Sequence, residues 1–318
     1  MIEINNLRKV FGPIVAVDRL TMSVGKGEVL GFLGPNGAGK STTMKMITGF
    51  LTPSAGTASV CGHDVKAATL AAQRTIGYLP EGAPAYPDMT PESFLRFVAG
   101  VRGLRGKAAK TRIETAADLV QLHGVMRQPI ETLSKGFKRR VGLAQAILHD
   151  PDVLILDEPT DGLDPNQKHD VRQLIRRMAG EKCVILSTHI LEEVDAVCTR
   201  AVVIARGSIV ADETPASLRA RAANHNAVTL VVTGEHAGLV GALRTLPGVA
   251  GIDDPRSSGA EFRCRVFASK GKEIAPAIAQ KIRLLGLTLD RLGVEQGNLD
   301  EVFREITLKN KPEEEVAA

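Results

Sequence analysis

The sequence predicts a chain of two parts: an α/β domain with a parallel sheet over residues 1–220, and a small α+β domain over residues 221–308. Short, continuous apolar runs at 153–156 and 184–186 are typical of parallel strands that are covered on both faces. A glycine-rich loop at 34–41 lies between an apolar strand and a helical pattern. The second part has the element order β-α-β-β-α-β, which is typical of a split βαβ sandwich.

The composition fits a soluble globular protein of about two domains. The chain has 318 residues, of which 44% are hydrophobic and 24% are charged. The formal net charge is only +4 and has no long runs, so nothing requires a nucleic-acid or membrane surface as a partner. With nine Phe, two Tyr and no Trp, the chain is also poor in aromatic side chains that stack on single-stranded bases. We therefore expect no nucleic-acid partner.

The sequence has no apolar stretch long enough to span a bilayer, and its N-terminus does not resemble a signal peptide. Any membrane role is therefore expected to depend on a partner. The four cysteines have neither C-x-x-C spacing nor a companion His cluster, and Cys183 lies in an apolar run. This pattern indicates free thiols in a reducing cytoplasm and no structural zinc.

The loop at 34–41 has the pattern G-x-x-x-x-G-K-[ST], which binds phosphates. Its backbone N–H groups wrap the anion, its glycines permit the close approach, and its lysine adds a charge. The apolar run at 28–33 precedes the loop, and Met44, Ile47 and Leu51 follow it at helical spacing. Strand, loop and helix are thus in the arrangement that points a helix N-terminus at the anion. The predicted nucleotide-binding residues are Gly34, Pro35, Asn36, Gly37, Ala38, Gly39, Lys40, Ser41 and Thr42.

A helical block is predicted over about residues 88–150, between this loop and the later strands. Thr90 and Pro91 have the types preferred at an N-cap and a first helical position. The proline-rich stretch at 80–87 leads into the block. Such a stretch suits a stiff hinge, and it is equally compatible with a surface loop.

A second helix in this block begins after Leu133, and its first turn is strongly basic. Four cations crowd there, namely Lys135, Lys138, Arg139 and Arg140. Positive charge opposes the dipole at a helix N-terminus unless an anion is bound. A phosphate is one explanation, and a solvated basic face is another. No phosphate loop is near in sequence, so the anion could belong to another chain.

The buried strand at 153–156 leads directly into Asp157 and Glu158. Two acids at the carboxyl end of a core strand cost desolvation energy. With Ser41 as a hydroxyl ligand, Asp157 can hold Mg²⁺ through its water shell, and Glu158 can activate or position the attacking water. The alternative is that both acids merely cap the next turn.

The strand at 184–186 leads through Ser187 and Thr188 to His189. A single histidine is usually structural. At the carboxyl end of a core strand, however, a neutral imidazole can sense the γ-phosphate and orient the water.

The second part of the chain ends in a short helix and a charged tail. The predicted strands and helices are, in order, strand 227–232, helix 237–246, strand 249–252, strand 260–267, helix 273–285, strand 288–294 and helix 298–303. Residues 309–318 are charged and broken by a proline, so we expect them to be disordered.

The order of these motifs over residues 1–220 resembles that of the ATP-binding subunits of ABC transporters. The resemblance implies a phosphate-loop nucleotide-binding domain with a β-rich subdomain, a parallel core sheet and a helical subdomain, followed by a ferredoxin-like domain. ATP and Mg²⁺ are the implied cofactors, and ATP hydrolysis is the implied reaction. The implied assembly is a two-fold, head-to-tail homodimer that closes around two ATP molecules, together with integral-membrane permease subunits.

The resemblance also assigns roles to particular residues. The segment before the basic helix is the family's signature, in which Ser134 and Gly136 meet the nucleotide of the opposite subunit. Phe11 matches the aromatic residue that stacks on adenine. Asp164 belongs to the loop that passes beside the partner's site, and His189 matches the switch histidine.

Two departures from the family pattern are visible. The family's usual glutamine in the hinge is Glu81, which can reach Mg²⁺ but cannot donate a hydrogen bond. Lys135 and Phe137 replace the commoner Gly and Gln of the signature. These variants, with the closing helix, resemble a branch of cytoplasmic subunits of exporters for drugs, sodium, polysaccharide or gliding-motility components.

The sequence therefore predicts a cytoplasmic ATPase subunit that lies on the inner face of the membrane through a separate permease, and export is the expected direction of transport. One alternative is a non-transport ABC ATPase of DNA repair or translation, but the chain lacks a long insertion between Ser41 and Leu133 and has only one ATP domain. Another is an unrelated phosphate-loop kinase or GTPase, but the chain has no base-reading Asn-Lys-x-Asp motif.

Overall fold

The computed structural model describes residues 1–83 and 85–309. The chain divides into two compact units, Met1–Glu213 and Thr214–Ala318. The sequence placed this boundary near residue 220, whereas the division falls earlier because α8 (Pro215–Arg219) contacts α11 (Leu299–Lys309) of the second unit. The tail predicted to be disordered lies, from residue 310 on, outside the described residues.

The first unit contains a four-stranded antiparallel sheet formed mainly by the start of the chain. Its strand order is β2-β1-β4-β5. The strands are β1 (Ile2–Phe11), β2 (Ile14–Val24), β4 (Ala55–Val60) and β5 (His63–Asp64).

The second sheet of this unit has six strands in the order β10-β9-β3-β8-β7-β6. They are β3 (Val29–Leu33), β6 (Ile76–Leu79), β7 (Val153–Asp157), β8 (Cys183–Thr188), β9 (Arg200–Ala205) and β10 (Ser208–Glu213). Every neighbouring pair is parallel except β9 and β10. The predicted parallel sheet is therefore confirmed, and the carboxyl ends of its parallel strands meet at one edge.

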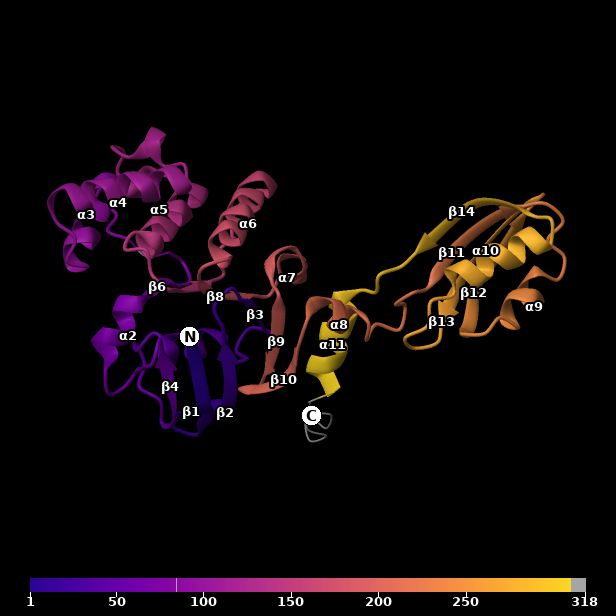
Figure 1. The fold of residues 1–318 in the computed structure, drawn as a ribbon, viewed down its shortest axis with the longest axis horizontal. Coiled ribbons are helices and arrows are strands. Elements are labelled where there is room, and N and C mark those ends of the chain that lie inside the picture. Colours follow the sequence, from indigo (N-terminus) through magenta and orange to yellow (C-terminus); the bar gives the residue numbers. More distant parts are fainter. Residues whose placement is uncertain (84, 310–318) are drawn as a thin grey trace. The chain divides into compact units, whose positions relative to one another are not determined.

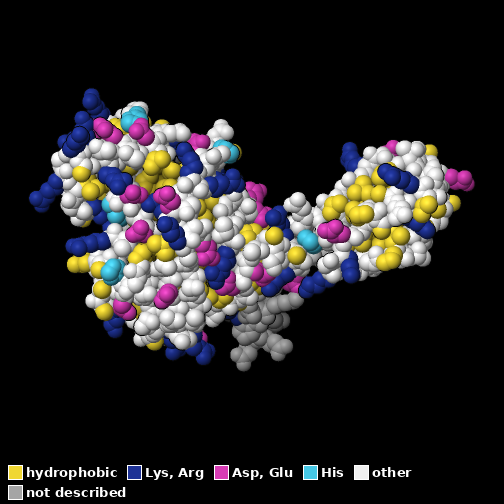
Figure 2. Space-filling model, in the orientation of Figure 1, with side chains coloured by type: hydrophobic (Ala, Val, Ile, Leu, Met, Phe, Trp, Pro, Cys, Tyr) yellow, Lys and Arg dark blue, Asp and Glu magenta, His cyan; other side chains and the backbone are white. Residues whose placement is uncertain are grey.

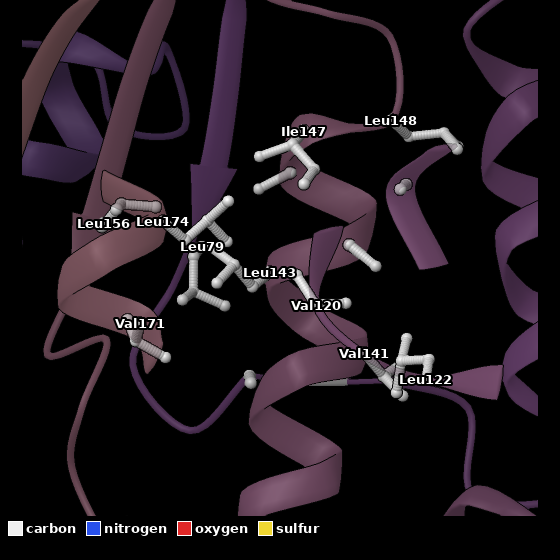
Figure 3. Close-up of a cluster of buried hydrophobic side chains, with 14 of the residues drawn as sticks. Leu79, Val120, Leu122, Val141, Leu143, Ile147, Leu148, Leu156, Val171 and Leu174 are labelled. Atoms are coloured by element: carbon white, nitrogen blue, oxygen red, sulfur yellow. The ribbon is translucent and has the colours of Figure 1, made fainter. Parts of the chain in front are cut away.

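Both faces of the parallel sheet are covered, which explains the continuous apolar runs. Along β7, Leu154 and Leu156 face one hydrophobic cluster, while Val153 and Ile155 face another. Figure 3 shows the first cluster, in which Leu79 and Leu156 of the sheet lie among side chains from α5 (Lys135–Ile147) and α6 (Pro165–Ala179). Because successive side chains of a strand point to opposite faces, a strand between two cores must be apolar throughout.

Along the chain, the predicted helical block is inserted between β6 and β7, which are neighbours in the sheet, and Figure 1 shows α3, α4 and α5 gathered together. It contains α3 (Pro91–Val101), α4 (Gly106–Leu119), the 3₁₀ turns His123–Val125 and Ile130–Thr132, and α5. Thr90 caps α3 as predicted, since its hydroxyl accepts from Ser93 N and Ser93 accepts in return. The remaining helices of the unit are α1 (Lys40–Ile47), α2 (Thr69–Thr75), α6 and α7 (Leu191–Val197).

The second unit has the predicted element order and one antiparallel sheet in the order β12-β13-β11-β14. Its central elements are β11 (Val228–Thr233), α9 (Leu239–Arg244), β12 (Val249–Ser258), β13 (Glu261–Ala268), α10 (Ala275–Leu284) and β14 (Thr288–Val294). Alternate residues of β11 and β13, such as Leu230 and Cys264, form its core with α9 and α10.

Three elements of this unit differ in length from their predictions. Strand β12 extends to Ser258 rather than 252, because it pairs with β13 as an exposed edge whose polar side chains hide the strand pattern. Helix α9 is shorter than 237–246: it ends at Arg244, and it begins only at Leu239 because its N-cap Gly238 has a left-handed φ of 84°. Helix α11 continues beyond Phe303 to Lys309.

Candidate functional site

The glycine loop joins β3 to α1, as the sequence predicts. Gly39, directly before α1, has a φ of 105°, and a Cβ there would lie 2.5 Å from the Ala16 carbonyl oxygen. A Cβ at Gly34 would lie equally close to the Ile204 carbonyl. Neither position accepts a side chain, so the loop backbone is pressed between β2 and β9 directly before the N-terminus of α1, where an anion can bind.

Lys40 is held inside this loop and is only 7% exposed. Its Nζ donates to Gly34 O at 2.7 Å and to Pro35 O at 3.2 Å. Burial lowers the pKa of Lys40, and the carboxylates of Glu158, Asp157 and Glu81 oppose that shift. Lys40 thus lies between the loop and three acids. A bound phosphate would replace the carbonyls of Gly34 and Pro35 as the hydrogen-bond partner of the Lys40 ammonium.

A cavity of about 290 Å³ opens in front of the loop. It is lined by Ala16, Asn36, Gly37, Gly39, Lys40, Ser41, Thr42, Glu81 and Glu158. The structure therefore brings together predicted residues that are more than a hundred positions apart in sequence. Larger hollows of about 870 and 1140 Å³ lie elsewhere on this unit, but neither contains the glycine loop. The larger is bordered by α3 and α4, and Figure 2 shows Lys and Arg side chains around that part.

Asp157 ends β7 and is 1% exposed. The Ser187 hydroxyl donates to its carboxylate, and the Glu158 amide donates to Ser187 O at 3.1 Å. The adjacent strands β7 and β8 thus fix the acid pair through Ser187, which sequence reasoning did not assign. A Ser at the end of an apolar strand was the available signal.

The oxygen donors here suit Mg²⁺ that arrives with a nucleotide. Ser41 and Glu81 line the cavity, and Asp157 ends β7 directly before Glu158, which also lines it. No group of three or more His, Cys, Asp or Glu side chains able to hold a metal occurs within residues 1–83 and 85–309. Mg²⁺ characteristically uses one or two carboxylates together with substrate phosphates, so this sparse set fits it.

Glu158 has an unusual backbone and a defined partner. Its φ is 50°, a left-handed conformation that is strained for a residue with a side chain. His189 Nδ1 lies 2.9 and 3.0 Å from its two carboxylate oxygens. The Glu158 side chain is 12% exposed and that of His189 is 53% exposed. This geometry suits a base or water-positioning group with an adjustable imidazole beside it.

Glu193 of α7 is a buried acid that sequence reasoning missed. The hydroxyls of Thr160 and Thr188 both donate to its carboxylate, the latter at 2.9 Å. Burial raises the pKa of Glu193. The side chain ties the segment after Glu158 to the residue before His189. The sequence alone gives no reason to single out Glu193 rather than the neighbouring Glu192.

The basic first turn of α5 does not require an anion, contrary to the sequence argument. Arg139 is 6% exposed and donates to backbone carbonyls. Lys138 Nζ donates to Glu131 O at 2.8 Å, and Arg140 pairs with Asp170 at 3.2 Å. Protein acceptors therefore account for three of the four cations.

Nine predicted site residues do not line the cavity: Phe11, Gly34, Pro35, Ala38, Ser134, Gly136, Asp157, Asp164 and His189. Ser134 and Asp164 are N-caps, accepting from Phe137 N at 3.3 Å and from Gln167 N at 2.9 Å. A Cβ at Gly136 would collide with the Gln167 side chain. Phe11 is 46% exposed at the end of β1. The expected roles of Ser134, Gly136 and Asp164 beside a partner's nucleotide, and of Phe11 against adenine, stay predictions.

The parallel sheet, the glycine loop with Lys40 and the acids at the end of β7 define a phosphate-loop nucleotide-binding protein. Comparison with known proteins specifies the family. The family model for the ABC transporter domain matches residues 17–161. The linearmycin resistance ATP-binding protein LnrL of Bacillus subtilis (strain 168) is 31% identical over 96% of this chain and 98% of its own length. The chain therefore belongs to the ABC transporter family, among its ATP-binding proteins.

Two further comparisons agree with this assignment. YbhF of Escherichia coli (strain K12), named a probable multidrug ABC transporter ATP-binding protein, is 39% identical over 70% of this chain. This chain spans only 39% of the length of YbhF. A solved ATP-binding subunit of an ABC transporter superposes with a TM-score of 0.64 at 30% identity, covering 69% of this chain and 92% of that one. The predicted nucleotide-binding fold is confirmed, and ATP with Mg²⁺ is the cofactor pair of such a domain.

Proposed function

We propose that this chain is the ATP-binding and ATP-hydrolysing subunit that powers a separate membrane permease, in the direction of export. The observation that carries the proposal is the cavity in which Lys40, Ser41, Glu81 and Glu158 meet. Relatives named for multidrug transport and linearmycin resistance support export.

In the proposed reaction, the loop N–H groups and Lys40 bind the phosphates of ATP. Ser41, Asp157 and Glu81 would hold Mg²⁺, which neutralises developing charge on the phosphates when bound. Glu158 orients or deprotonates the attacking water, and its strained φ of 50° aims it from the end of β7. His189, 2.9 Å from Glu158, orients that carboxylate.

The site is proposed to be completed by a second copy of the chain. Ser134, Gly136 and Asp164 lie outside the cavity of their own chain. In a two-fold, head-to-tail arrangement, each chain presents them to the other's nucleotide. Phe11, exposed at the end of β1, is available to stack on adenine.

A groove of about 870 Å³ in the first unit supports a permease partner. Phe50, Leu70 and Val101 border it and are each more than 70% exposed. On its floor, Tyr78 Oη and His149 Nδ1 are buried without a hydrogen-bond partner among the described residues. An apolar cytoplasmic segment of the permease with a polar group at its tip would satisfy both.

None of the helices in the described part of the chain combines the length and the apolarity that a bilayer crossing needs. Because its relatives are named as ATP-binding proteins of transporters, we propose that the chain lies in the cytoplasm, on the inner face of the membrane, held there by the permease.

The test is to express tagged Glu158→Gln in its native host with ATP, and to identify what co-purifies from detergent-solubilised membranes. A protein with several apolar spans supports the transport function. Recovery of only ribosomal or DNA-bound partners would instead support a non-transport ABC ATPase. Leu70→Asp in the same background should lose the permease while nucleotide binding remains, because Leu70 is not part of the phosphate cavity.

A further inference from the structure

Arg139 is a buried arginine that reaches the backbone on both sides of Glu158. Its Nη2 donates to Asp157 O at 2.9 Å, and its Nε donates to Pro159 O at 3.2 Å. Its Nη1 lies 3.5 Å from Pro80 O, directly before Glu81. One guanidinium thus links α5 to the two peptide segments that carry the acids of the phosphate cavity.

These contacts suit an arginine and no other side chain. The planar guanidinium presents donors in several directions, whereas a lysine ammonium would reach one or two of these carbonyls. Burial lowers the pKa of Arg139, and the nearby acids Asp161, Asp157, Glu158 and Glu81 oppose the shift. A strained residue such as Glu158 keeps its conformation only where its surroundings fix it, and Arg139 holds the carbonyls on either side.

Arg139 also lies on the helix that carries the residues expected to meet the partner's nucleotide. Ser134 caps α5, and Gly136 lies in its first turn. Arg139 is five residues after Ser134, or about 7 Å along the helix at 1.5 Å per residue. A helix moves as a rigid rod over that length. Docking of Ser134 on the partner's nucleotide would therefore act on the peptides beside Glu158.

We propose that Arg139 is a positioning residue that makes the Glu158 geometry in one cavity dependent on the docking of the same chain's α5 on the opposite nucleotide. The inference rests on the proposed ATP hydrolysis in a two-fold dimer. It adds a link between the two sites that runs through the protein, along α5 and the hydrogen bonds of Arg139. A purely structural Arg139 would contribute to stability without affecting turnover or cooperativity.

The test uses the full chain with Arg139→Gln, and Arg140→Gln as the matched control one position along the same helix. Arg140 instead donates to Val120 O, Gln121 Oε1 and the Asp170 carboxylate. We measure ATP affinity by equilibrium binding, and kcat, KM and the Hill coefficient for MgATP hydrolysis. For Arg139→Gln, we expect affinity within about threefold of wild type, kcat lower by about tenfold or more, and a Hill coefficient near one. Arg140→Gln should keep wild-type kcat.

Chemical rescue covers the possibility that Arg139→Gln folds poorly. In Arg139→Ala, guanidinium ion at millimolar concentration should enter the vacated site and restore part of kcat, whereas it should not stimulate Arg140→Gln. Wild-type kcat and Hill coefficient in Arg139→Gln, or no rescue of Arg139→Ala, would overturn the proposal. Failure of the proposed function is distinguishable, because then the wild-type chain itself would not hydrolyse ATP and Glu158→Gln would change nothing.

Discussion

Glu158 is the residue whose geometry most directly suggests chemistry. Its carboxylate lines the phosphate cavity, its backbone is left-handed, and His189 contacts both its oxygens. Glu158→Gln keeps the shape but removes the base. We expect ATP binding to persist and turnover to fall by about 10² to 10⁴-fold. In the proposed dimer, unhydrolysed ATP would hold the two chains together, so the variant should sediment as a dimer with ATP. Turnover at the wild-type rate would remove Glu158 from the mechanism.

His149 gives the first unit an acid-sensitive site. Burial, aided by the charge of Arg102, lowers its pKa to about 4 from the usual 6.5. One ring nitrogen, Nε2, contacts Ile76 O at 3.1 Å. Because the pKa of His149 is depressed in the folded chain, the contribution of its neutral imidazole to the unfolding free energy is fully present above pH 6.5. That contribution is lost as the pH falls through about 4.

We therefore expect His149→Gln to be less sensitive to acid than the wild type. Between pH 7 and pH 4 the wild type should lose about 2 kcal/mol more unfolding free energy than the variant, a value that allows for partial solvent screening. Urea denaturation at several pH values measures this difference. His63→Gln, at an exposed histidine, is the control. Parallel pH profiles for wild type and His149→Gln would contradict the prediction.

At the scale of elements, α3 begins with a reciprocal cap. Thr90 Oγ1 accepts from Ser93 N at 3.2 Å, and Ser93 Oγ accepts from Thr90 N at 2.9 Å. Thr90→Ala should destabilise the helix by about 1 kcal/mol, because the Ser93 N–H loses the hydroxyl that accepts its hydrogen bond. Amide hydrogen exchange in α3 measures the loss. Thr90→Ser retains the hydroxyl and should restore protection, and equal exchange in both variants would argue against the cap.

The elements also indicate what a sequence can predict. Strands β7 and β8 were predictable because both faces are buried, so their apolar runs are continuous. The extent of β12 was not, because an exposed edge strand carries polar residues on both faces. The phosphate loop is a local pattern, and its residues were predicted from spacing alone.

Contacts between distant segments were beyond the sequence argument. The four cations at the start of α5 suggested an anion, but three of them find protein acceptors, namely Glu131 O, Pro159 O and the Asp170 carboxylate. Likewise, the Glu193 carboxylate finds its hydrogen-bond donors, Thr160 and Thr188, only when the ends of β7 and β8 lie side by side in the folded sheet. Such side chains are identified by tertiary neighbours, and no local spacing encodes those.

At the scale of the molecule, the unit that contains the nucleotide site and the second unit each have their own hydrophobic core. All residues lining the phosphate cavity belong to Met1–Glu213, whereas Leu230, Phe262 and Ile278 belong to the core of the second unit. A ligand stabilises only the cooperative unit whose folded form binds it. Calorimetry should therefore resolve two transitions, of which MgATP moves only one.

The size of that shift follows from mass action. At a hundred times the dissociation constant, ATP adds about 2.7 kcal/mol to the unfolding free energy. For a unit of this size, that corresponds to a rise in Tm of about 5–10 °C. Using Glu158→Gln prevents hydrolysis during the scan. Adding Lys40→Ala should abolish the shift, because the buried ammonium that meets the phosphates is gone. A single transition, or two that move together with MgATP, would mean that the two cores do not unfold independently.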